Sequence, residues 1–160
     1  MKTIFWLDFV LILNQKSIKH WIKIYLEKNI FGSSHLKNNK VDLLPIVEGI
    51  IGLDPMMRFA AIIDLKGNIS EAIMKEGKTS LKSQKEEEHF CKQVAVRRKI
   101  RQQFDKSLGP VNYVHIERQK ITQIVIYPKR KTVYVTMEAN MDMKRKLEIV
   151  KSIKQKTTKL

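Results

Sequence analysis

Residues 57–74, MRFAAIIDLKGNISEAIM, hold two apolar segments on either side of a short polar turn. Residues 57–64 carry apolar side chains that would lie on both faces of a sheet, which is typical of a strand covered on both sides. In residues 69–74 the side chains alternate as expected for a second strand. Gly67 and Asn68 tolerate positive φ and favour a tight turn between the segments. The stretch therefore predicts a β-hairpin whose first strand lies in the middle of a sheet.

Helices are predicted on both sides of this hairpin. Residues 41–52 favour a short helix, because their leucine, valine and isoleucine side chains share one face and a glycine can end it. Residues 86–108 favour a long helix that begins with three glutamates, which suit the positive end of the helix dipole, and ends before a Gly-Pro pair. Three strands with short connections and a last helix follow. Their predicted ranges are 111–119, 121–128 and 131–139 for the strands and 142–154 for the helix.

The resulting order is helix, strand, strand, helix, strand, strand, strand, helix, which predicts an α/β (α+β) domain. Short connections between the last three strands favour an antiparallel meander. We therefore expect a five-stranded antiparallel sheet with the first strand in the middle. Such a sheet needs cover on both faces. The long central helix is expected on one face, with the first and last helices on the other.

Residues 1–40 differ in character from the remainder of the chain. Residues 4–13 are nearly all apolar, but this run is too short to span a bilayer. Residues 18–26 carry an amphipathic stripe, the pattern of a helix resting on a membrane surface, and residues 31–40 favour a polar linker. Three interpretations stay open. The extension is an extra helix that docks on the domain, a segment (residues 1–28) that binds a membrane surface or a partner groove, or a leader that is not natively translated.

The chain of 160 residues has the length of one domain. We assign residues 41–155 to that domain and residues 156–160 to a basic tail that is expected to fray. The single cysteine, Cys91, excludes an intramolecular disulfide framework and favours a reducing compartment. A cytoplasmic protein is therefore expected.

No motif in the sequence points to catalysis, to a metal or to a cofactor. The four histidines lack metal-ligand spacing, and one cysteine cannot complete a zinc pattern. Neither a glycine-rich phosphate loop nor a nucleophile elbow is present. We therefore expect a protein that is not an enzyme and that uses no cofactor.

The formal charge of +15 and the isoelectric point near 9.9 would attract polyanions. Phosphate contacts need only clustered Lys and Arg, whereas base readout needs side chains placed in a groove or aromatic stacking platforms. Tyrosines on the last three predicted strands would serve as such a platform only if one face of the sheet were free. Nucleic-acid binding is thus the alternative function. The candidate anion-binding residues are Arg98, Lys99, Lys129, Arg130 and Lys131.

The predicted long helix carries arginines on its apolar face. At 100° per residue, four apolar residues and two arginines fall within one narrow arc, while Arg98 and Lys99 point elsewhere. Burial of an unpaired guanidinium costs on the order of several kcal/mol. The two arginines therefore either extend along apolar surface to water or belong to a subunit interface, where arginine is enriched. The candidates for a dimer or partner interface are Phe90, Val94, Arg97, Arg101, Phe104 and Leu108.

The order of elements and the hairpin resemble the roadblock/LC7 family, small α/β domains related in shape to the longin and profilin folds. The resemblance covers residues 41–153. It is carried by LDPMMRFAAIIDLKGNISEA at 53–72, by the long helix, by the three-strand meander and by the closing helix. The hairpin and RRKIRQQFDKSLGPV at 97–111 are also similar to small archaeal proteins built on that plan.

This resemblance implies a protein without catalytic residues of its own. Roadblock-like domains dimerise, commonly through the central helix and the neighbouring edge strand, and they serve as scaffolds or as regulators of small GTPases. The resemblance therefore favours a homodimeric interaction module, with a small GTPase as the class of partner, over the nucleic-acid alternative.

Overall fold

The computed structural model describes residues 41–160. The amphipathic extension, the linker and the membrane contact predicted for residues 1–40 lie outside the described residues. Between residues 41 and 160, no helix combines the length and the apolar character needed to cross a bilayer.

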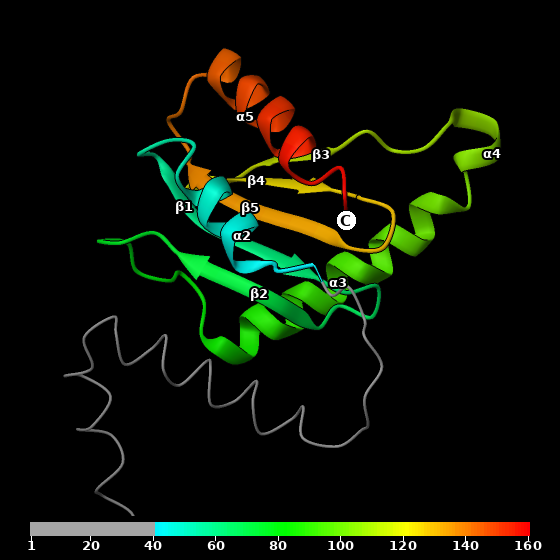
Figure 1. Ribbon diagram of the computed structural model, residues 1–160, viewed down its shortest axis with the longest axis horizontal. Coiled ribbons are helices and arrows are strands. Elements are labelled where there is room, and N and C mark those ends of the chain that lie inside the picture. The colour runs from blue at the N-terminus through cyan, green and yellow to red at the C-terminus, as the bar shows by residue number, and fades with distance from the viewer. Residues whose placement is uncertain (1–40) are drawn as a thin grey trace, which may run out of the picture. The chain divides into compact units, whose positions relative to one another are not determined.

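A five-stranded antiparallel sheet forms the middle layer (Figure 1). The order of its strands is β2-β1-β5-β4-β3, so the last three strands form the predicted meander and β5 joins them to the hairpin β1–β2. The predicted α/β fold class is confirmed. The strands are β1 (Met57–Ile63), β2 (Ile69–Met74), β3 (Val114–Glu117), β4 (Ile121–Ile126) and β5 (Thr132–Glu138).

The predicted position of the first strand is wrong, because β5 occupies the middle of the sheet and β1 is second from an edge. Both strands are buried along nearly their whole length. Burial on both faces shows only that a strand lies inside the layers, and it does not distinguish the central strand from its neighbour. The pairing of β1 with β5, from Met57 opposite Met137 to Ile63 opposite Thr132, decides the order.

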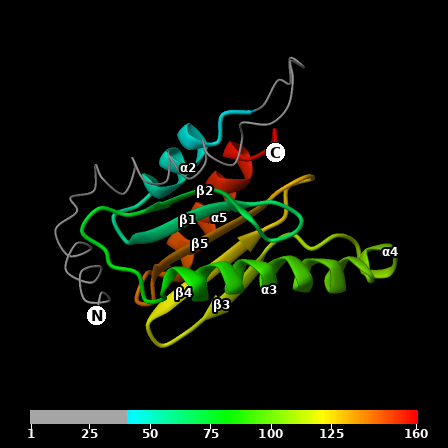
Figure 2. The ribbon, with the colours of Figure 1, turned by 90° about the horizontal axis from the view of Figure 1, so that it is seen from below.

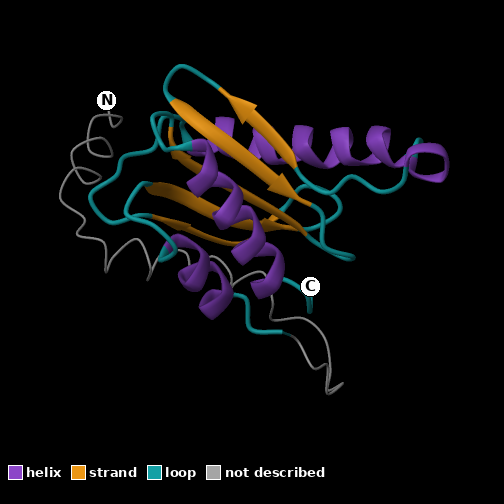
Figure 3. Ribbon diagram, turned by 90° about the horizontal axis from the view of Figure 1, so that it is seen from above, coloured by secondary structure: helices purple, strands orange, loops and turns teal. Residues whose placement is uncertain are grey.

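The helices cover the two faces as predicted. α3 lies on one face, and α2 and α5 lie on the other (Figure 2). In Figure 3, α5 lies across the strands. The core accordingly has two parts: a larger one between the sheet and α2 with α5, and a smaller one between the sheet and α3. The helices are α2 (Leu44–Ile51), α3 (Gln84–Gln102), α4 (Asp105–Leu108) and α5 (Met143–Lys156).

The long helix begins and ends earlier than predicted. Ser83 precedes its first turn and forms a capping box: its Oγ accepts from the backbone N of Glu86, and the Glu86 carboxylate accepts from the backbone N of Ser83 at 2.7 Å. The hydroxyl of Ser83 also donates to the Glu86 carboxylate at 2.7 Å, and this bond, followed by the one from the Ser83 backbone N, lowers the pKa of Glu86. At the other end, Gln103 and Phe104 donate to carbonyls three residues back, which tightens the chain and ends α3 before the separate short helix α4. The predicted single helix to Leu108 is therefore two helices.

The last residues do not fray, in contrast to the prediction. Thr157 is 2% exposed and Leu160 is 8% exposed, and Leu160 belongs to the larger part of the core. The hydroxyl of Thr157 donates to the carbonyl of Ile153 at 2.7 Å, and the backbone N of Arg130 donates to the carbonyl of Leu160 at 3.0 Å. Lys156 and Lys159, which precede Thr157 and Leu160, are exposed. The segment is basic in composition, but apolar burial holds it to the domain.

Candidate interaction surface and basic pocket

The inner face of α3 packs on β1, β4 and β5. Its buried side chains are Cys91, Val94, Ala95 and Arg98, and Phe90 lies at their margin with its ring 5.0 Å from that of Tyr134. Burial raises the pKa of the Cys91 thiol to about 12, which makes this cysteine unreactive at neutral pH. The inner face is therefore part of the core.

Arg98 is the buried arginine of α3, with 5% of its surface exposed. Its Nη1 donates to the carbonyl of Lys131 and, at 3.0 Å, to Thr132 Oγ1. Its Nη2 donates to the carbonyls of Pro128 at 2.8 Å and Lys129 at 3.4 Å. The guanidinium thus ties α3 to the connection between β4 and β5. The predicted orientation of Arg98, exposed and away from the sheet, is wrong.

The prediction that six interface candidates share one face of a single helix is also wrong. Phe90 and Val94 face the sheet, whereas Phe104 is 55% exposed and Leu108 is 82% exposed. The break after Gln102 separates the two pairs, so the angles of one continuous helix do not apply. The arginines divide as well, as Arg97 is exposed and Arg101 is half-buried.

Four large apolar side chains of α3, of α4 and of the link between them are exposed. We call Val96, Ile100, Phe104 and Leu108, which are 50%, 51%, 55% and 82% exposed, the outer α3–α4 patch. Val96 and Ile100 are one turn apart on α3 and are new relative to the sequence candidates. The sequence contained this information, because a helical wheel places Val96 and Ile100 together, opposite the side that carries Cys91 and Val94. Because α3 is apolar on two sides, one side packs against the sheet and the other side stays exposed.

The remaining basic candidates lie on or beside the β4–β5 connection. Lys129 and Arg130 are exposed, as is Lys99 on α3, while Lys131 Nζ donates to Ser70 Oγ at 3.0 Å. A tyrosine platform for nucleic-acid bases is not available on this sheet. Tyr134 is fully buried beneath α3, and helices cover both faces.

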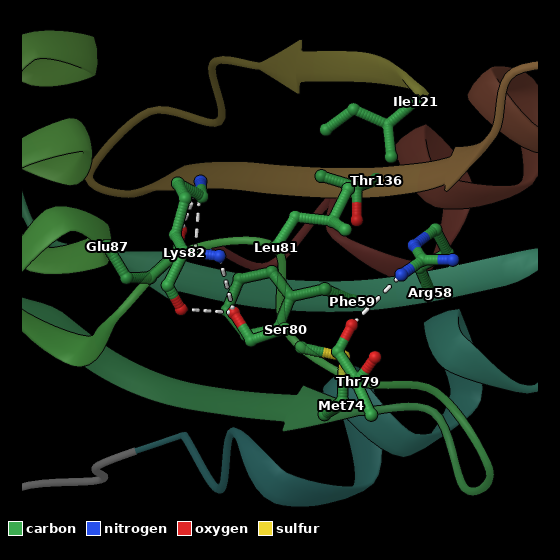
Figure 4. A pocket seen from close by; sticks show the side chains of 10 residues that line it. All are labelled: Arg58, Phe59, Met74, Thr79, Ser80, Leu81, Lys82, Glu87, Ile121 and Thr136. Atoms are coloured by element: carbon green, nitrogen blue, oxygen red, sulfur yellow. Dashed lines mark hydrogen bonds and ion pairs between the residues drawn. The ribbon is translucent and has the colours of Figure 1, made fainter.

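A small hollow lies beside the start of α3 (Figure 4). Lys82 crosses its margin: its Nζ lies 3.0 Å from the Glu87 carboxylate, donates to Tyr134 Oη at 3.2 Å and lies 4.1 Å from the centre of the Phe90 ring. The cavity volume is about 20 Å³, which is room for little more than one water molecule. This hollow is therefore too small for an organic ligand.

A larger cavity, of about 240 Å³, lies where α3 ends; we call it the basic pocket. Its polar lining includes two arginines, a lysine and a tyrosine, and Arg101 Nη1 donates to Tyr127 Oη at 2.9 Å. Burial lowers the pKa of Arg98, an effect that Tyr127 and Asp105 oppose. The full lining is Arg98, Arg101, Gln102, Asp105, Pro110, Val111, Tyr127 and Lys129.

A second buried cation, Lys146 of α5, has a structural role. Its Nζ donates to Glu117 Oε1 of the edge strand β3 at 2.9 Å and to the carbonyl of Ala139 at 3.2 Å. Glu117 also accepts from Thr122 Oγ1 at 2.6 Å and lies 2.6 Å from His115 Nε2. The bond from Thr122, followed by that from Lys146, lowers the pKa of Glu117 to about 2. The cluster keeps β3 attached to α5. Among the described residues, no group of histidine, cysteine or acidic side chains has the arrangement of a metal site.

Comparison with known families adds to this geometry. A family model described as "Family of unknown function (DUF6659)" matches residues 47–159. The chain belongs to this family. The match spans all the elements of the sheet and the helices α3, α4 and α5. No curated protein matches the chain of this DUF6659 member.

Solved structures similar to this DUF6659 domain share its fold. The gliding protein MglB from Thermus thermophilus has a TM-score of 0.61 and 12% identity, over 72% of this chain and 85% of that chain. An MglB structure described as having a tetrameric arrangement has a TM-score of 0.57 and 11% identity, over 72% and 88%. A roadblock/LC7 domain from Streptomyces avermitilis has a TM-score of 0.53 and 14% identity, over 72% and 97%. The predicted roadblock/LC7-like fold is confirmed.

Proposed function

We propose that this protein is a non-catalytic interaction module that works as a homodimer, with the outer α3–α4 patch at the subunit interface. The observation that carries the proposal is the exposure of four large apolar side chains within 13 residues, two of them one turn apart on α3 and two at or beyond its end. A group of exposed large apolar side chains is typical of a protein–protein contact. Arg97, the exposed neighbour of Val96 in the sequence, supplies the type of side chain that is enriched at such contacts.

The fold supports self-association. Roadblock-like domains commonly dimerise through the helix that corresponds to α3, and the MglB structure with a tetrameric arrangement shares this fold. In this proposal Phe90 and Val94 do not contact the second subunit. They pack α3 on the sheet and so position the interface helix. Arg101 belongs to the basic pocket as well as to the end of the interface helix.

Charge reversal in the outer α3–α4 patch is expected to separate the subunits. In the double variant Ile100→Glu and Phe104→Glu, two carboxylates per subunit would meet their copies in the contact. Light scattering should then show half the mass of the parent protein, with an unchanged circular dichroism spectrum. Removal of two central apolar anchors typically weakens an interface by about 2 kcal/mol or more each, which is enough to dissociate a micromolar dimer.

The matched control is Met143→Glu with Leu147→Glu on α5. These residues are 48% and 40% exposed, so the same chemistry is placed on the opposite face of the sheet. This variant should retain the mass of the dimer. A monomeric parent protein, or dissociation caused by the α5 variant alone, would contradict the proposed interface.

We further propose that the partner of the homodimer is a small GTPase, as the roadblock-like fold suggests. Immobilised protein should retain a guanine-nucleotide-binding polypeptide from native extract, in amounts that differ between GDP and a non-hydrolysable GTP analogue. Nuclease treatment should leave this capture unchanged. Loss of all bound material after nuclease treatment would instead favour the nucleic-acid alternative, which the charge of +15 also suggests.

A further inference from the structure

We propose that the basic pocket binds a small organic anion through its carboxylate or phosphate groups. The basic pocket is polar and positively charged, whereas the outer α3–α4 patch is apolar, so the two surfaces would bind different partners. It combines a cavity of about 240 Å³ with three cationic side chains drawn from α3 and from the β4–β5 connection.

Arg98 forms the fixed wall of the site. The four hydrogen bonds from its two terminal nitrogens lock the guanidinium in place. Each of these acceptors is a neutral oxygen, so no carboxylate compensates the buried charge. Its Nε is buried and has no hydrogen-bond partner among residues 41–160. The uncompensated positive charge of Arg98 favours an anion in the adjoining cavity through its electrostatic field.

Two further cations lie at the same cavity. Arg101 is held through its bond to Tyr127 Oη, and Lys129 is exposed at the margin. Within the described part of the chain, none of Arg98, Arg101 and Lys129 has a carboxylate oxygen within 4 Å. Asp105 is the one acidic residue of the lining, so positive charge exceeds negative charge in the pocket. An anionic ligand restores the balance.

The size and the walls of the cavity indicate the kind of anion. Its volume of about 240 Å³ is about twelve times that of the hollow beside Lys82 and exceeds the space that a single phosphate ion needs. Pro110 and Val111 form an apolar side, and the ring of Tyr127 lies 5.2 Å from the guanidinium carbon of Arg98. The pocket therefore suits a ligand with two anionic groups, or with one anionic group on a short carbon frame. Guanidinium groups recognise carboxylate and phosphate oxygens with the same geometry.

Calorimetric titration of the full chain with pyrophosphate and with citrate, at one fixed ionic strength, tests the site. The parent protein should bind at least one of the two probes saturably, with one site per chain. The stronger probe identifies phosphate or carboxylate as the preferred group. Chloride at the same ionic strength serves as the reference for general screening.

The diagnostic variant is Arg101→Gln with Lys129→Gln, which spares the buried Arg98. It should weaken binding by about tenfold or more, because two charge-assisted contacts are lost. The charge-matched control is Lys144→Gln with Lys151→Gln, two exposed lysines of α5 on the other face, and it should change affinity less than about twofold. Asp105→Asn should strengthen binding, since it removes the opposing charge.

Equal weakening in the two double variants would show general attraction to a basic surface and would overturn the proposal. Absence of saturable binding by the parent protein to both probes would overturn it as well. Neither result bears on the dimer, whose test is a mass measurement on substitutions outside the pocket.

Discussion

Replacement of Gly67 by alanine is expected to destabilise the domain by about 2–4 kcal/mol, through two effects that act together. Gly67 adopts a φ of +90° in the β1–β2 turn, where a residue with a Cβ is strained. A Cβ at this position would also lie 2.6 Å from Cα of Lys92 and 2.9 Å from the carbonyl oxygen of Cys91. These are backbone atoms of α3 and cannot rotate away. The hairpin would have to move off the helix, and denaturant unfolding should show the loss.

Gly77→Ala is the matched control for this experiment. Gly77 has a φ of +75°, but a Cβ there would meet no atom within 4 Å. Its alanine variant should therefore show the backbone strain alone, about 1 kcal/mol. Equal losses in the two variants would mean that the close approach of turn and helix contributes nothing to stability.

Arg98→Met is expected to destabilise the domain by about 2–4 kcal/mol, because charged donors contribute roughly 1.5–3 kcal/mol each and part of this is offset by the cost of burying the charge. Methionine keeps much of the apolar stem but leaves the carbonyls of Pro128, Lys129 and Lys131 without their donors. The effect should be centred on the β4–β5 connection. Hydrogen exchange should accelerate there more than in the hairpin β1–β2.

Arg97→Met makes the same chemical change at the neighbouring residue of α3. Arg97 is exposed, so in the dissociated Ile100→Glu, Phe104→Glu background its loss should alter the free energy of unfolding by no more than about 0.5 kcal/mol. Comparison of the two variants thus tests which side of α3 faces the sheet. A larger effect at Arg97 than at Arg98 would mean that α3 presents a different side to the sheet.

The layered arrangement was predictable because it depends on local patterns. Two apolar segments around a Gly-Asn turn predict the hairpin 57–74, and short connections between apolar segments predict the meander. The position of β5 at the centre was not predictable in this way. It follows from the pairing of β1 with β5, whose partners are more than 60 residues apart in the chain, such as Ile63 and Thr132.

The candidate site was predicted in composition but not in geometry. Apolar residues occur on two sides of α3, with Cys91 and Val94 on one and Val96 and Ile100 on the other, so periodicity alone leaves the buried side ambiguous. The prediction treated residues 86–108 as one helix. On that helix, Phe104 and Leu108 fall in the same arc as Arg97, which made this side look apolar. The carbonyl groups that accept hydrogen bonds from Arg98 belong to the β4–β5 connection, about 30 residues later in the chain. No pattern within the helix indicates them.

The sequence by itself determined the fold class, the order of elements, the two-sided cover of the sheet and the strong positive charge, since each depends on neighbouring residues or on composition. Only the tertiary structure decided which arginine is buried, which apolar row of α3 is left exposed and that cations from separate elements line one cavity. The physical reason is that burial is a property of a packed surface. A helix carries its side chains in a fixed angular order, but the sheet it contacts selects the side that becomes core.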